Sequence, residues 1–286
     1  MKLITYLHAG CESVGICTTD EAAVLPLPQY EDMNDLIVRS SLAELAQLQQ
    51  QGGAVLPLGE VKVLAPIPVP KQDLICLGIN YRAHSDEIAH SFGKEQLKKR
   101  NVPIYFGKRV NRAVAPGDVV DGHFAICDSL DYECELAVII GKEAKQVAPE
   151  QVQDYIFGYT IVNDVSARNI QTAYKQWYFG KSLDDFTPMG PCIVTADAIA
   201  YPPKLNLSCS INGELRQNSN TELLVHDITY IVSELSQGMT LLPGTIIITG
   251  TPGGVGMGMQ PPCFLHSGDV MECTIESIGT LVNKVK

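Results

Sequence analysis

Apolar positions along this chain recur mostly in short runs separated by Gly, Pro and Asp, a pattern typical of β-strands. The predicted strands are residues 3–7, 14–17, 74–77, 125–126, 136–140, 157–162, 192–194, 205–211, 245–249 and 270–275. Helical periodicity is confined to a stretch after Ser41 and to residues 165–177 and 226–237. The chain therefore reads as a strand-dominated α+β protein without regular alternation of strands and helices.

The first 65 residues are predicted to form a small α+β domain. Ser41 and Glu44 have the spacing of a capping box, and the apolar periodicity that follows stops at Gly52 and Gly53. Residues 66–72 lie in a Pro-rich stretch that favours a stiff, extended linker. We therefore predict an N-terminal domain over residues 1–65, a linker over 66–72 and a larger domain over 73–286.

One predicted strand, residues 130–141, begins with acidic residues at every second position and continues as an apolar run. Alternation along a strand places Asp131, Glu133 and Glu135 on the same face. Three carboxylates so close raise one another's pKa unless a cation compensates them. A hard divalent metal is one candidate, and an exposed edge strand with a solvated acidic face is the other.

Composition and charge limit the classes of partner. The 286 residues are 45% hydrophobic, enough for a substantial core, and 21 basic against 32 acidic residues give a net charge of −11. This balance argues against nucleic acid or an anionic membrane as the partner and leaves room for a small anionic substrate. The nine cysteines are scattered without a Cys-x-x-Cys pair, as expected of reduced, mostly buried thiols. With no signal peptide or membrane-length apolar run in the sequence, we expect a cytoplasmic protein.

Four polar clusters go beyond what packing requires. In a helix, His84 and Glu87 would be neighbours three residues apart, suited to a general base whose carboxylate orients the imidazole, or simply a surface pair. Asp164 follows a strand at an N-cap position, with Arg168 and Gln171 above it on the same helical face.

Lys181 forms the third cluster. It precedes a Pro- and Gly-rich turn and is either held rigidly near the sheet or engaged in a surface salt bridge. The fourth is the Gly-rich stretch 249–258, whose backbone N–H groups can approach an anion closely. It lacks the ending of a P-loop, so nucleotide binding is excluded, and a plain tight connection is the alternative.

Taken in order, these segments resemble the fumarylacetoacetate hydrolase family over roughly residues 70–286. The matching motifs are Gly78-x-Asn80-Tyr81-x-x-His84-x-x-Glu87, Glu133-x-Glu135-Leu136, Asn163-Asp164-x-Ser166-Ala167-Arg168, Lys181-Ser182 with Phe186-x-Pro188-x-Gly190-Pro191, and Thr249-Gly250-Thr251-Pro252-x-Gly254-Val255-Gly256. Two departures are Asn169, where the family often has Asp, and Lys108-Arg109, where a Lys-Pro pair is common. The second leaves the role of Lys108 open.

The resemblance implies a mixed β-sandwich roll, a homodimer, and Mg²⁺ or Mn²⁺ held by Glu133, Glu135 and Asp164, with Ca²⁺ able to replace them in crystals. Asp131 falls outside this ligand set, so an Asp131→Asn variant is expected to keep most of the metal and the activity. The predicted catalytic residues are His84, Glu87 and Lys181. The predicted substrate-binding residues are Asn80, Tyr81, Arg168, Gln171, Gly250 and Thr251.

The implied reaction is metal-dependent hydrolysis of a C–C bond in a small anionic 2,4-diketo acid, such as an acylpyruvate. The metal and Lys181 would stabilise the enolate, and His84 with Glu87 would activate water. The alternatives on the same site are decarboxylation of oxaloacetate or another β-keto acid, and keto–enol isomerisation or hydration. A non-catalytic protein that binds metal and a keto acid is a further alternative. The Lys-rich segment 88–103 is either a lid over the site or a solvated loop.

Overall fold

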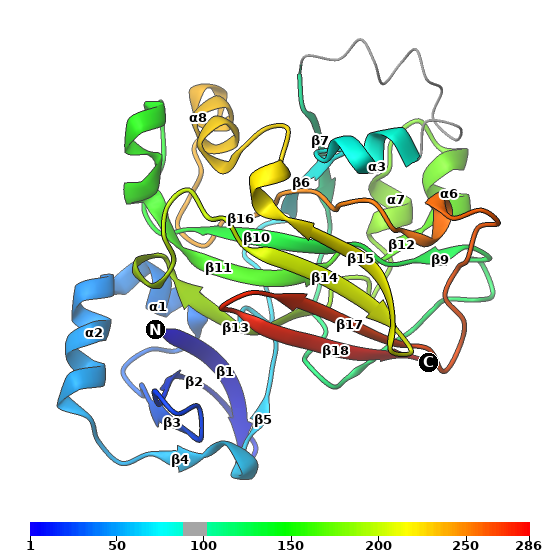
Figure 1. The fold of residues 1–286 in the computed structure, drawn as a ribbon. Coiled ribbons are helices and arrows are strands. Elements are labelled where there is room, and N and C mark those ends of the chain that lie inside the picture. Colours follow the sequence, from blue (N-terminus) through cyan, green and yellow to red (C-terminus); the bar gives the residue numbers. More distant parts are fainter. Residues whose placement is uncertain (88–101) are drawn as a thin grey trace.

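The computed structural model describes residues 1–87 and 102–286, and nearly all of its strands lie in two sheets (Figure 1). The larger sheet runs in the order β4 (Leu56–Pro57), β3 (Ala23–Pro26), β2 (Cys11–Cys17), β1 (Lys2–His8), β13 (Met189–Thr195), β11 (Ile156–Asn163), β10 (Cys134–Ile140), β16 (Ile246–Ile248), β6 (Leu74–Gly78) and β7 (Ile104–Lys108), with β5 (Lys62–Val63) paired to β1. The second sheet runs in the order β15 (Glu214–Asn220), β14 (Asn206–Ile211), β17 (Val270–Ile275), β18 (Gly279–Val285) and β8 (Val119–Val120).

The remaining elements are short. β9 (Leu130–Asp131) and β12 (Ser166–Ala167) form a two-stranded ladder. The α-helices of the described chain are α1 (Met33–Arg39), α2 (Leu42–Gln51), α3 (Arg82–Glu87), α6 (Arg168–Ala173), α7 (Tyr178–Lys181) and α8 (Ile228–Gly238). Its 3-10 helices are η1 (Leu58–Glu60), η2 (Pro149–Tyr155), η3 (Ala196–Ala198), η4 (Thr221–Leu223) and η5 (Gly256–Gly258). The prediction of a strand-dominated α+β sandwich is confirmed.

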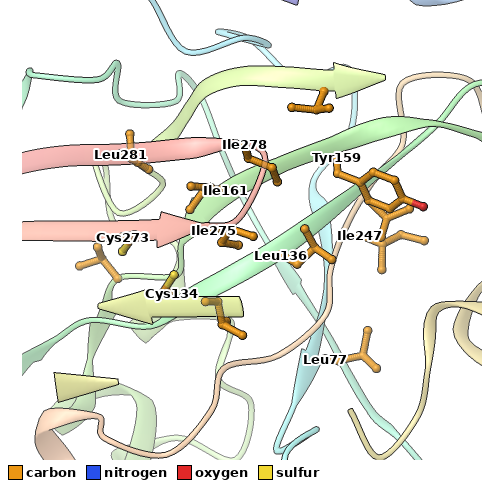
Figure 2. Packing of buried hydrophobic residues seen from close by; sticks show 14 of the residues in the cluster. Leu77, Cys134, Leu136, Tyr159, Ile161, Ile247, Cys273, Ile275, Ile278 and Leu281 are labelled. Carbon is orange, nitrogen blue, oxygen red and sulfur yellow. The ribbon is translucent and has the colours of Figure 1, made fainter. Parts of the chain in front are cut away.

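The main core lies between the two sheets. Figure 1 shows β14, β15, β17 and β18 crossing β10 and β11, and Figure 2 shows the side chains between these strands. Leu136 and Ile161 of the larger sheet belong to the same buried cluster as Ile275 and Leu281 of the second sheet. Full burial of such side chains contributes roughly 1.5–3 kcal/mol each, so this layer holds the sandwich together.

A second core lies on the other face of β10. Ala137 and Ile139 belong there, in a cluster that also contains Leu74 of β6 and Leu36 of α1. Because side chains alternate along a strand, the odd-numbered residues of β10 all point to this face. Glu135 therefore points away from the second sheet, toward the face of β10 that carries this second core.

The N-terminal residues behave largely as predicted. Helix α2 begins with a complete capping box, in which Ser41 accepts from the backbone of Glu44 and the Glu44 carboxylate accepts from the backbone of Ser41. Strand β1 pairs with β13, so the larger sheet continues from this segment into the rest of the chain. The division into domains at residues 66–72 stays a prediction.

Four strand ends meet at one edge of the larger sheet. β6 and β16 are parallel, β10 is antiparallel to β16, and β11 is antiparallel to β10. The carboxyl ends of β6, β16 and β11 therefore lie beside the amino end of β10. The chain leaves this edge through Gly78, Thr249, Asn163 and Cys134, which brings the motif segments together.

Some sequence predictions were wrong in detail. Residues 125–126 form a turn with Ile126 exposed, not a strand. The helix expected from residue 165 begins at Arg168, and Asp164 does not cap it, because Ser166 and Ala167 first pair with β9. The proposed lid falls largely on residues 88–101, outside the described residues.

Two findings bear on the predicted environment of the chain. Seven of the nine cysteines are buried, and Cys11 and Cys263 are exposed. Across residues 1–87 and 102–286, no helix has both the length and the apolar character needed to span a membrane.

Candidate active site

The three predicted metal ligands lie together. Glu133 precedes β10, Glu135 lies in it, and Asp164 follows β11, the strand paired with β10. One carboxylate oxygen from each lies within 4.8 Å of the others, and all three residues are buried. The Asn163 side chain accepts from the backbone N–H of Glu133 at 2.9 Å, and the backbone N–H of Asp164 donates to the carbonyl of Glu133 at 2.8 Å. These bonds fix two ligands relative to each other.

Three buried cations surround the acidic cluster. Lys181 Nζ lies 2.7 Å from both Glu133 Oε2 and Asp164 Oδ2. Lys108 Nζ lies 2.7 Å from Asp164 Oδ1 and also donates to the backbone carbonyls of Val165 and Lys181. Arg168 lies 2.7 Å from Glu133 Oε1 through its NH2 group. Lys181 is therefore held rigidly beside the sheet, as its sequence context predicted.

The cations are unequally shared between the carboxylates. Burial alone would raise the pKa of Glu133, but Lys181 and Arg168 outweigh it and hold that pKa well below its usual range. Burial, reinforced by Asp164 and Glu133, raises the pKa of Glu135 well above its usual value. Within the described chain, the carboxylate of Glu135 accepts one hydrogen bond, from Gly250 N–H at 2.6 Å. Glu135 is thus the carboxylate most in need of another cation.

A divalent ion fits this arrangement. Three carboxylates are the hard oxygen donors that Mg²⁺ and Mn²⁺ prefer. With Asp131 there are four carboxylates against the three cations Lys108, Arg168 and Lys181, one net negative charge if all seven groups are ionised. A divalent ion would turn this into one net positive charge, which suits an anionic substrate.

The Gly-rich stretch binds anions that belong to the protein itself. Gly250 N–H donates to Glu135, and Gly254 N–H donates to Glu87 Oε2 at 2.9 Å. Gly256 and Met257 donate to the two oxygens of Asp131 at 2.7 and 2.9 Å. The prediction that these amides approach an anion is correct, but the anions are three carboxylates of the chain.

His84 and Glu87 lie together on α3, as expected from their spacing, and their role as a dyad stays a prediction. His84 Nδ1 lies 3.7 Å from Glu87 Oε2, an ion-pair distance that is too long for a hydrogen bond. His84 is buried, and Glu87 is fixed by Gly254. A side chain on Gly258 would collide with the Glu87 carboxylate, so glycine is required for this close approach.

A narrow pocket opens onto the cluster. Of the predicted site residues, it is lined by His84, Glu133, Glu135, Arg168, Gln171, Lys181 and Thr251. Its apolar wall includes Phe106, Trp177 and Met257. Two of the predicted metal ligands, His84 and three predicted substrate contacts therefore share one cavity, and Asp164 and Glu87 do not line it.

Other predicted substrate contacts are not brought to this pocket. The Asn80 side chain donates to the carbonyls of Thr249 and His226 and accepts from the N–H of His226, so it ties chain segments together. Tyr81 is 1% exposed and does not line the pocket. Gly250 gives its N–H to Glu135. Asn80 and Gly250 thus make structural bonds, whereas the buried Tyr81 hydroxyl has no hydrogen-bond partner in the described part of the chain; the substrate contacts expected of all three stay predictions.

Two polar side chains were missed or left open by sequence reasoning. Lys108 proves to contact Asp164, although its motif departs from the family pattern. Gln217 is fully buried; it accepts from Cys134 N–H at 3.0 Å and donates to Thr251 Oγ1 at 2.7 Å. A glutamine in a polar strand carries no local signal of such a role.

The chain belongs to the fumarylacetoacetate hydrolase family. The family model described as fumarylacetoacetate (FAA) hydrolase C-terminal matches residues 73–286. The class defined by the fold and the acidic cluster is therefore that of a metal-dependent enzyme of this family.

Individual relatives differ in the activities for which they are named. The chain is 44% identical over 246 residues to oxaloacetate tautomerase YisK of Bacillus subtilis (strain 168), covering 85% of this chain and 80% of the relative. The solved fumarylacetoacetate hydrolase of Exiguobacterium antarcticum is 37% identical, with a TM-score of 0.87, and covers 100% of this chain and 99% of that one. Maleylpyruvate hydrolase from Sphingobium sp. SYK-6, solved with manganese(II) and pyruvate, is 29% identical, with a TM-score of 0.79 and coverage of 100% and 98%.

Proposed function

We propose that this protein is a divalent-metal-dependent oxaloacetate tautomerase, which interconverts the keto and enol forms of oxaloacetate. The observation that carries the proposal is the 44% identity to a relative named for this activity, over most of both chains. The site supports it, because a cluster that becomes net positive with a divalent ion suits a small dianion. We further propose Mg²⁺ or Mn²⁺ as the metal, held by Glu133, Glu135 and Asp164.

The bound ion would supply Lewis acidity, polarising the keto oxygen of the substrate and acidifying the neighbouring C3–H bond. Lys181 keeps Glu133 and Asp164 in place through its two 2.7 Å contacts and adds positive charge beside the position where negative charge develops. This charge is preorganised, because the lysine is buried and already paired.

Arg168, Gln171 and Thr251 would orient the substrate's carboxylates. Gln171 Oε1 accepts from Arg168 NH1 at 2.9 Å, which fixes the amide so that its Nε2 remains available to the pocket. The Thr251 hydroxyl already donates to the carbonyl of Cys134 at 3.1 Å and accepts from Gln217, so this side chain is fixed and would orient the substrate by packing, with Arg168 and Gln171 as the donors. Fixed donors reduce the entropy lost when a small substrate is bound.

His84 would carry the proton. In the keto-to-enol direction its imidazole takes a proton from C3, the C3–H electron pair forms the C2–C3 double bond, and the imidazolium then returns that proton to the former keto oxygen. No water is consumed and no C–C bond breaks. Glu87, 3.7 Å from the imidazole, stabilises the imidazolium while it exists.

This proposal favours one of the alternatives over the hydrolysis expected first from the motifs. Hydrolysis of a 2,4-diketo acid is retained as the second candidate for a specific reason. The His84–Glu87 pair suits water activation, and one solved relative is named maleylpyruvate hydrolase. The homodimer implied by the family resemblance remains a prediction.

The test uses purified protein with Mn²⁺ and freshly dissolved enol oxaloacetate. Ketonisation is followed by the loss of enol ultraviolet absorbance, and pyruvate release is measured in parallel to detect decarboxylation. We expect fast ketonisation without pyruvate, and a His84→Ala variant slowed by about 10²–10⁴-fold. Glu135→Gln protein with the same Mn²⁺ controls for catalysis by the free ion.

The outcomes separate the candidates. If the wild-type protein ketonises oxaloacetate no faster than Mn²⁺ with the Glu135→Gln control, the tautomerase proposal is wrong. Cleavage of an acylpyruvate to pyruvate and a carboxylic acid, without ketonisation, would establish the hydrolase in its place.

A further inference from the structure

We propose that Asp131 is a positioning residue that aims Arg168 at the substrate, a role that rests on the proposed function of the same site. The family resemblance places Asp131 outside the metal ligands, and the structure gives it a different set of partners. The expectation that Asp131→Asn keeps most of the activity is revised accordingly: the metal should stay and substrate binding should weaken.

Every acceptor direction of the Asp131 carboxylate is used. Oδ1 accepts from the backbone N–H of Tyr132 at 3.0 Å and of Gly256 at 2.7 Å. Oδ2 accepts from Met257 N–H at 2.9 Å and from Arg168 Nε at 2.8 Å. The side chain is fully buried, so no water competes for these bonds. A carboxylate fixed by three backbone amides is a rigid anchor for a guanidinium.

Asp131 binds Nε of Arg168 and leaves the NH1 and NH2 groups for contacts within the site. With Nε held by Asp131, NH2 lies 2.7 Å from Glu133 Oε1 and NH1 donates to Gln171. Arg168 and Gln171 both line the pocket, whereas Asp131 does not. Without Asp131, Nε would lose its acceptor and the guanidinium would be free to rotate out of the orientation that it presents to the pocket.

A positioning role for Asp131 and its charge alone predict opposite effects of Asp131→Asn on the affinity for an anionic substrate. Replacing Asp131 by Asn removes one negative charge near the pocket, and by charge alone an anion should then bind more tightly. With the Asn amide nitrogen toward Arg168, N–H2 meets Nε and the anchor is lost; with the oxygen there, Arg168 keeps only a neutral acceptor and the N–H2 group faces the amides of Tyr132 and Gly256. In both orientations Arg168 loses its charged partner at Nε and the side chain no longer matches all four donors. Positioning therefore predicts weaker anion binding despite the more positive site.

The experiment measures binding of Mn²⁺, and then of oxalate to the Mn²⁺-loaded protein, by titration calorimetry. We expect Asp131→Asn to raise the Kd of oxalate by about 10- to 100-fold, the effect of losing a charged hydrogen bond. The Kd of Mn²⁺ should stay within about threefold, and the KM for oxaloacetate should rise more than kcat falls. Asp128→Asn, the same change at an exposed carboxylate nearby, is the matched control. Equal or tighter oxalate binding, or equal losses of Mn²⁺ and oxalate affinity, would overturn the proposal.

A double-mutant cycle with Arg168→Lys tests whether Asp131 acts through the guanidinium. The effect of Asp131→Asn on oxalate binding should largely vanish in the Arg168→Lys background. An effect of the same size in both backgrounds would show a structural role only.

Hydrogen exchange on the wild-type protein keeps the inference testable should the Asn variant not fold. The Gly256 and Met257 amides should be strongly protected, although they lie in a connecting segment, and exchange at the rate of an open loop would refute the anchor. Oxalate binding does not depend on turnover. A protein that shows these effects but fails to ketonise oxaloacetate would refute the tautomerase and leave the role of Asp131 intact.

Discussion

Replacing Glu135 by Gln should make the metal-free protein more stable while abolishing its response to metal. Glu135 is 1% exposed and lies close to two other carboxylates. Within the described residues it accepts one hydrogen bond, from Gly250 N–H. A glutamine keeps the acceptor for Gly250 N–H and replaces the second oxygen with an N–H2 group that can donate to Glu133 or Asp164. The substitution thus removes like-charge repulsion without leaving a buried polar group unpaired.

The pH dependence follows from the raised pKa of Glu135, which burial causes first and the neighbouring carboxylates increase. The folded protein holds this proton more tightly than the unfolded chain, where the pKa is about 4.3. The stability contributed by the protonated group is therefore complete below that pH and is lost as the pH rises through the folded-state value. Each tenfold difference in proton affinity corresponds to about 1.4 kcal/mol. The advantage of the Gln variant should be present at pH 7 and fade near pH 4.

Bound metal should make the wild type more stable than the Glu135→Gln variant, the reverse of the order expected without metal. Mn²⁺ at about 100 times its Kd would stabilise the wild type by about 2.7 kcal/mol. Since 1 kcal/mol shifts Tm by about 2–4 °C for a protein of this size, we expect a rise of about 5–10 °C. The Gln variant lacks one of three ligands and should show little of this rise. Differential scanning calorimetry with EDTA and with Mn²⁺, at pH 7 and near pH 4, measures all four conditions.

Two results would refute this reasoning. One is a Gln variant less stable than the wild type in EDTA at pH 7, which would mean that Glu135 is already compensated by the protein. The other is an undiminished Mn²⁺-induced shift, which would remove Glu135 from the metal site. Glu143→Gln, the same substitution at an exposed position, should leave both Tm and its Mn²⁺ dependence unchanged.

Two further substitutions test the site and its support. Lys181→Met removes a cation that lies 2.7 Å from two predicted ligands. Mn²⁺ binding, measured by electron paramagnetic resonance, should be at least as tight as in the wild type, and kcat should fall by about 10²–10³-fold. Weaker Mn²⁺ binding with a normal kcat would contradict this. Gly250→Ala should lower the unfolding free energy in urea by about 1–3 kcal/mol, because φ is +97° and the new Cβ would lie 2.8 Å from that of Asn80. Gly59→Ala, with open space around its Cβ, is the control, and an equal loss there would refute the strain argument.

The sequence predicted correctly those helices and strands that depend on neighbouring residues alone. The capping box of α2 needs Ser41 and Glu44 alone, and β10 is an apolar run that is buried on both faces. The helix after Asp164 was placed wrongly because a residue of N-cap type gives the same local signal whether or not a helix follows directly. Here the chain first pairs with β9, through a contact about thirty-five residues distant. Strand β18 was missed because polar Asn283 interrupts its pattern, although its amide is buried and donates to the carbonyls of Ala115 and Asp118.

The candidate site shows the same limit. Motif order brought Glu133, Glu135, Asp164 and Lys181 into one hypothesis, and the structure places them in contact. Most partners of Asp131 could not be predicted, because two of its three amide donors come from a segment more than 120 residues later in the chain. Spacing along one strand shows which carboxylates share a face, whereas the groups that neutralise them are set by tertiary packing.

The pairing of β1 with β13 has a consequence for expression of the enzyme in pieces. Residues 73–286 carry the whole family match, which makes this stretch an obvious candidate for a minimal fragment. Removing the first 65 residues would leave β13 as an open strand edge and take away the N-terminal members of the apolar cluster to which Ala137 and Ile139 of β10 belong. Such a fragment would contain every candidate catalytic group and still be prone to aggregate. The recognisable sequence unit and the smallest soluble unit are therefore expected to differ in this protein.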